Sequence, residues 1–94
     1  MAWTLECKRD VLKFLGKQDN VIQYTIRSLL NLLLDNLKSG IVPFNIMDIK
    51  NLKGKMNGFM RLRVGNIRII FKIDIELSKV KVYAINYRGD VYKH

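Results

Sequence analysis

The fold is decided by residues 59–75, FMRLRVGNIRIIFKIDI. On both sides of Gly65-Asn66, apolar side chains alternate with charged or exposed ones at a period of two, which is typical of half-buried β-strands. Glycine followed by asparagine between two such runs predicts a two-residue hairpin turn of type II′. We therefore expect two antiparallel strands joined at this turn.

A two-residue turn also fixes which residues face each other across the hairpin. The expected pairs are Val64 with Ile67, Arg63 with Arg68, Leu62 with Ile69, and Met60 with Phe71. The apolar pairs share one face, so Arg63 lies opposite Arg68 on the other, with Arg61 two residues along. Like charges in this position destabilise a sheet by up to about 1 kcal/mol, a cost that an anion bridging the guanidinium groups would offset. The alternative interpretation is that water solvates each arginine separately and that no anion bridges them.

The positive charge of the chain is concentrated around this hairpin. The 94 residues carry a net charge of +9, yet residues 1–49 and 73–94 each contribute only +1. Residues 50–72 hold seven Lys and Arg and no Asp or Glu. A localised basic segment indicates an anionic partner, with nucleic acid the first candidate.

The remaining sequence predicts one α+β domain over residues 1–94. We expect a strand at 2–7, a helix at 8–17, and a second helix that begins at Asp19 or Asn20 and ends near Gly40 and Pro43. A strand at about 79–87 completes a three-stranded antiparallel meander, and the two-helix hairpin packs on one face of the sheet. In this last strand, Val80, Val82 and Ala84 are expected on one side, and Lys81, Tyr83 and Ile85 on the other.

Other candidate sites are weaker. Cys7 is the only cysteine, which fits a reducing cytoplasm and a small core residue better than a nucleophile. His94 is the only histidine, so no triad or metal cluster can form around it. The apolar runs are too short to span a membrane. Leu32 and Leu34 lie off the apolar stripe of the second helix, where they suit either a protein-docking surface or packing against the first helix.

Three motifs give the chain a resemblance to a known family. They are Leu52-Lys53-Gly54, the run from Arg61 to Phe71, and the segment Tyr87-Arg88-Gly89-Asp90-Val91-Tyr92. In order and spacing they are similar to the motifs of the RelE/ParE superfamily of toxins from toxin–antitoxin systems. The resemblance covers nearly the whole chain and implies the RelE-like fold.

The resemblance also implies an activity and partners. RelE-like members are ribosome-dependent mRNA endonucleases that use neither metal nor cofactor: the 2′-hydroxyl attacks the adjacent phosphate. Their partners are the ribosome, mRNA and a cognate acidic antitoxin, with which they form a hetero-oligomer in the cytoplasm. ParE-like members instead inhibit DNA gyrase, and others only bind an antitoxin, so these remain the alternatives.

The resemblance assigns roles to individual residues of this chain. Arg61 takes the place of a family lysine that helps to deprotonate the 2′-hydroxyl or to position the phosphate, and it is expected to contact the phosphate. Arg68 and Arg88 match arginines that neutralise the transition state, and Tyr92 matches a tyrosine that stacks on or orients the nucleotide. The expected RNA-binding residues are Lys53, Lys55, Arg63, Lys72 and Tyr87. Arginine is a very poor general base, so either the base is Lys53, Lys55, Tyr87 or Tyr92, or stabilisation of the transition state carries most of the rate.

Overall fold

A computed structural model describes residues 2–87 of the chain. Its elements follow in the order β1 (Thr4–Cys7), α1 (Arg9–Gly16), α2 (Asn20–Lys38), β2 (Ile49–Asn51), a 3₁₀ turn η1 (Gly54–Met56), β3 (Met60–Val64), β4 (Ile67–Asp74) and β5 (Lys79–Tyr87). No helix in this part of the chain is long and apolar enough to cross a membrane. The α+β class and both helices of the sequence prediction are confirmed.

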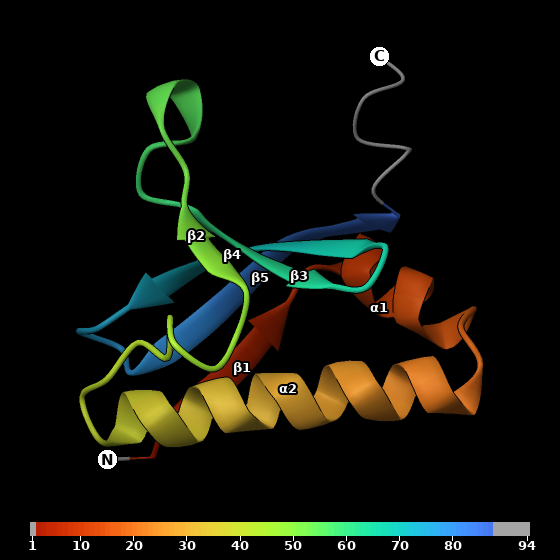
Figure 1. Cartoon of the computed structure of the whole chain (residues 1–94), viewed down its shortest axis with the longest axis horizontal. Helices are drawn as coiled ribbons and strands as arrows, with labels where there is room; N and C mark the ends of the chain where they lie inside the picture. The colour runs from red at the N-terminus through yellow and green to blue at the C-terminus, as the bar shows by residue number, and fades with distance from the viewer. Residues whose placement is uncertain (1, 88–94) are drawn as a thin grey trace.

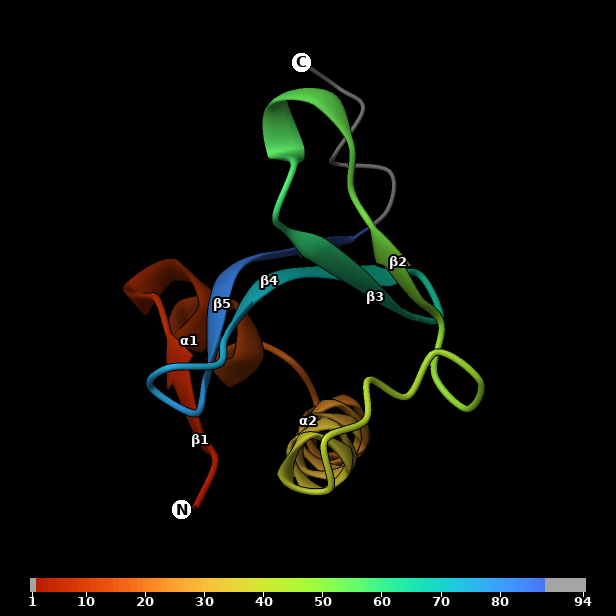
Figure 2. The ribbon, with the colours of Figure 1, turned by 90° about the vertical axis from the view of Figure 1, so that its left-hand side faces the viewer.

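The strands form one sheet in the order β1-β5-β4-β3-β2. The pairs β5–β4, β4–β3 and β3–β2 are antiparallel, whereas β1 runs parallel to β5. Helix α2 lies along one face of the sheet, and α1 packs against β5 near the β1 edge (Figures 1 and 2). The expected sheet lacked β2, a three-residue strand too short to show a period in the sequence.

The β3–β4 hairpin has the predicted register. Val64 pairs with Ile67 and Arg63 pairs with Arg68. Gly65 has a φ of +58°, and Asn66 is not among the residues with positive φ, as a type II′ turn requires. The turn therefore places one set of side chains in the core and the arginines on the opposite face.

The core lies between this sheet and α2. Asp19 begins α2, where its carboxylate accepts a 2.9 Å hydrogen bond from the backbone N–H of Ile22. Leu34 packs against the core, while Leu32 is exposed. The fully buried side chains come from both layers: Val11, Ile26, Leu33, Leu62, Ile69, Phe71, Val80 and Val82.

The predicted alternation in β5 is wrong beyond Val82. Ile70 pairs with Ala84 and Phe71 with Val82, so Tyr83 is an extra residue that forms a β-bulge. A bulge shifts the pleat by one residue. Ile85 is consequently buried in the core with Val82, although simple alternation put it on the other side.

The turn geometry gives a stability prediction. Replacement of Gly65 by Ala forces a side chain into the left-handed region and is expected to lower the free energy of unfolding by about 1 kcal/mol. The matched control is Gly16→Ala at the end of α1, where φ is not positive and a Cβ meets nothing within 4 Å. Urea denaturation should find this control neutral or slightly stabilised. Equal losses at both positions would contradict the assigned turn.

Candidate functional site

The sheet face turned away from α2, here called the outer face, carries the basic side chains of β3 and β4. Arg63 lies opposite Arg68, and Arg68 lies opposite Asn86 on β5. One step along, Arg61 lies between Lys50 and Ile70. The predicted opposition of Arg63 and Arg68 is therefore confirmed, and it forms the centre of the candidate site.

An internal carboxylate stands beside these arginines. Strand β2 continues its pairing at Asp48, whose carbonyl accepts a 2.9 Å hydrogen bond from the N–H of Arg63. Asp48 Oδ1 lies 2.6 Å from the Arg61 guanidinium, and Oδ2 lies 3.7 Å from Arg63 Nε. Sequence counting missed this contact because Asp48 lies just before the acid-free segment and is delivered by the strand that went unpredicted.

The ion pair changes the interpretation of Arg61. It was expected to contact phosphate directly, yet only 5% of the residue is exposed. Its guanidinium is directed to Asp48, whose own side chain is 48% exposed. Arg61 therefore supports the outer face from within, whereas Arg63 and Arg68 are only partly buried.

At the other end of the outer face, two aromatic rings meet above β4. Phe59 and Tyr83 are in edge contact, with ring centroids 5.0 Å apart. Lys72 Nζ lies 4.8 Å from the centre of the Phe59 ring, and Lys8 Nζ lies 5.0 Å from that of Tyr83. Such distances are typical of cation–π interactions. The expected RNA-binding residue Lys72 is thus on the outer face, but at the end remote from Arg63 and Arg68.

The loop between β2 and β3 carries two further expected RNA-binding residues. It contains η1, preceded by Lys53, and it projects from the sheet on the side opposite α2 (Figures 1 and 2). Lys53 and Lys55 are both exposed. Their mobile four-carbon stems place two cations on the same side of the sheet as the arginines.

The remaining expected site residues are Tyr87, Arg88 and Tyr92, of which the structure describes only Tyr87. Tyr87 pairs with the core residue Ile67, its ring is 5.4 Å from Phe14, and its hydroxyl donates to the side-chain oxygen of Gln18. It therefore faces the helices rather than the arginines. Arg88 and Tyr92 lie outside the described residues.

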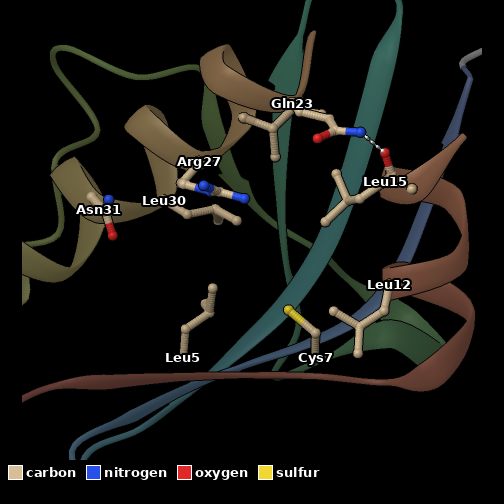
Figure 3. Close-up of a pocket in the computed structure, with 10 residues that line it drawn as sticks. Leu5, Cys7, Leu12, Leu15, Gln23, Arg27, Leu30 and Asn31 are labelled. Carbon is tan, nitrogen blue, oxygen red and sulfur yellow. Dashed lines mark hydrogen bonds between the residues drawn. The ribbon is translucent and has the colours of Figure 1, made fainter. Parts of the chain in front are cut away.

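On the helix side, an apolar groove runs between β1, α1 and α2 (Figure 3). Leucines are the commonest residues in its lining, with Arg27 and Asn31 on the α2 side (Figure 3). Gln23 closes one end by donating to the Leu15 carbonyl at 2.9 Å. Burial raises the pKa of the Cys7 thiol, which keeps it protonated near neutral pH. Within residues 2–87, no three His, Cys, Asp or Glu side chains gather closely enough to hold a metal ion. The leucines that line the groove suit contact with an apolar segment.

Comparison with solved structures identifies the fold. The chain matches a chain of the archaeal RelE–RelB complex from Pyrococcus horikoshii OT3 at 21% identity and a TM-score of 0.77, covering 95% of this chain and 98% of that one. It matches the RelB–RelE complex from Methanococcus jannaschii at 20% identity and 0.73, with 95% and 96% covered. The isolated E. coli RelE toxin gives 20% identity and 0.67, with 97% and 92% covered. No family model and no curated protein sequence matches. The protein thus has the fold of RelE toxins.

The buried ion pair gives a prediction for the site. Asp48→Ala leaves the Arg61 charge buried without its carboxylate, so the free energy of unfolding should fall by about 2 kcal/mol, less than for a fully buried pair because Asp48 is half exposed. The control is Glu6→Ala, which breaks the exposed 3.3 Å pair with Lys79 and should change stability by less than about 0.5 kcal/mol. Denaturant titration measures both, and equal losses would contradict a supporting role for Asp48.

Proposed function

We propose that this protein is a RelE-like toxin of a type II toxin–antitoxin system and that it cleaves mRNA on the ribosome. The observation that carries the proposal is the direct opposition of Arg63 and Arg68 on the outer face of a RelE fold. Two guanidinium forks at this spacing suit a phosphate, which can accept hydrogen bonds from both. The surrounding cations Lys53 and Lys55 add to the attraction for RNA.

The proposed reaction is an internal transfer at phosphorus. The ribose 2′-oxygen forms a bond to the adjacent phosphorus, the bond from phosphorus to the 5′-oxygen of the next nucleotide breaks, and a 2′,3′-cyclic phosphate remains. The 2′-hydroxyl loses a proton and the leaving 5′-oxygen gains one. Arg68, with Arg63 opposite, neutralises the extra negative charge of the transition state.

The remaining roles rest on the family resemblance. Arg88 would supply a second charge to the transition state, and Tyr92 would orient the nucleotide. Because an arginine does not deprotonate in a protein, the base is sought among Lys53, Lys55 and Tyr92. Tyr87 is a weaker candidate, since its hydroxyl is bonded to Gln18 on the helix side.

We expect a cognate acidic antitoxin as the protein partner, because the net charge is +9 and several solved relatives of this fold are complexes with RelB antitoxins. An amphipathic acidic segment could cover the basic face and also bury Leu12 in the apolar groove, where 58% of this leucine is exposed. Apolar burial would then give the affinity that charge alone does not.

Induction of the protein followed by mapping of mRNA 5′ ends on translating ribosomes tests the activity. Wild-type protein should produce new mRNA 5′ ends that carry a hydroxyl group, because the proposed reaction releases the 5′-oxygen of the next nucleotide. Removal of one charged group from such a transition state costs roughly 100-fold or more, so Arg68→Ala and Arg88→Ala should nearly abolish cutting, as should Tyr92→Phe if it orients the substrate. Lys38→Gln, at the end of α2, is the charge-matched control and should cut normally. Intact mRNA together with accumulated gyrase–DNA cleavage complexes would overturn the proposal in favour of a ParE-like toxin.

The antitoxin proposal has a separate test. The product of a small acidic reading frame that overlaps or adjoins the gene should co-purify with the wild-type protein. Leu12→Glu, an exposed position whose change should not disturb folding, is expected to weaken this binding at least tenfold because it replaces buried apolar area with a charge that must be desolvated. Undiminished binding of the Leu12→Glu variant, measured by calorimetry, would exclude the groove as the contact.

A further inference from the structure

Two lysines on the outer face are held in place by aromatic rings. Lys72 lies over Phe59 and Lys8 lies over Tyr83, and the two rings touch each other. The Lys72 stem passes close to Gly58, where an added Cβ would lie 3.5 Å from Lys72 Cε. Tyr83 follows the core residue Val82 and therefore lies on this face, at the bulge in β5. We name the set Lys8, Tyr83, Phe59 and Lys72 the lysine–ring row.

The row differs from the other lysines at this end of the sheet. Lys79 pairs with Glu6 at 3.3 Å and Lys81 pairs with Asp74 at 3.7 Å. Neither Lys8 nor Lys72 forms an ion pair within residues 2–87. Their ammonium groups are thus oriented by rings while their charge stays uncompensated by a carboxylate in this part of the chain.

The row is separated from the arginines along the sheet. Lys72 follows Arg68 by four residues of the same strand, which corresponds to about 13 Å at the rise of a β-strand. Lys72 Nζ is held over Phe59, which precedes the Met60–Phe71 pair and is level with Lys72 across the hairpin, so the ammonium group is not directed back along β4 toward Arg68. One phosphate cannot contact both positions, whereas an extended polyanion can.

We infer that the lysine–ring row is a second contact point for single-stranded RNA, at which Lys8 and Lys72 bind backbone phosphates one or more nucleotides from the phosphate held by Arg63 and Arg68. The inference rests on the proposed function for the identity of the ligand. The rings hold the lysines rather than stack on bases, since each already has an ammonium group over it. Side chains oriented in advance lose less conformational entropy when they bind.

The dependence of RNA affinity on salt concentration measures how many phosphate contacts the protein makes. The probe is a mixed-sequence 2′-O-methyl RNA ten nucleotides long, which lacks the free 2′-hydroxyl and therefore stays intact. Each phosphate contact on a single strand contributes about 0.7 to the slope of log affinity against log salt. Fluorescence anisotropy across a range of NaCl concentrations should find the slope of the Lys8→Gln/Lys72→Gln variant smaller by about 1.4 than that of the wild-type protein.

Two controls separate position from charge. Lys38→Gln removes a lysine from α2 and should leave the slope unchanged. Phe59→Leu keeps both lysine charges but removes one ring, so the slope should persist while the affinity falls about two- to tenfold, because one lysine side chain must then be ordered on binding. Circular dichroism confirms that each variant is folded.

The outcomes distinguish this inference from the proposed function. If Arg63→Gln/Arg68→Gln lowers the slope but Lys8→Gln/Lys72→Gln does not, the second contact point is overturned and mRNA cleavage stands. If Lys38→Gln lowers the slope as much as the paired lysine change, general charge explains the binding and the inference is likewise overturned. Loss of ribosomal mRNA cleavage is scored separately and concerns the proposed function alone.

Discussion

The register of the β3–β4 hairpin is the constraint on which the candidate site depends. Gly65 with its positive φ closes the turn in two residues, so Arg63 can only lie opposite Arg68. A slip of one residue would turn Leu62 and Ile69 to solvent and drive the arginines into the core, at a cost of several kcal/mol in lost apolar burial. The same contacts that fill the core therefore hold two like charges together on the outer face.

This register brings Arg63 and Arg68 together, and a carboxylate of the same chain offsets part of their charge repulsion. Asp48, brought to the edge of β3 by the short strand β2, contacts both Arg61 and Arg63. Its carboxylate takes part of the role that the sequence alone assigned to an external anion. Arg61 is consequently committed to the fold, whereas Arg63 and Arg68 remain partly exposed on the outer face.

The features that the sequence predicted and the features that it missed have different physical origins. The hairpin register, the Asp19 cap and the bounds of β5 depend on residues close together in the chain, so pattern and turn chemistry were sufficient. Strand β2 and the Tyr83 bulge depend on pairing with distant strands, which a local period does not contain. Only the first of these misses reached the site, because β2 delivers Asp48, whereas the bulge moves Ile85 into the core.

The two sides of the molecule offer different chemistry, and this bears on how it could bind two anionic partners. The outer face attracts any polyanion, so charge by itself does not separate RNA from an acidic protein. The groove around Leu12 lies on the helix side and is apolar. A nucleic acid gains little there, whereas an amphipathic polypeptide gains buried apolar area. Under the proposed function, a partner that reaches both sides would outcompete RNA without a better electrostatic match to the arginines, because its extra affinity would come from apolar burial on the helix side.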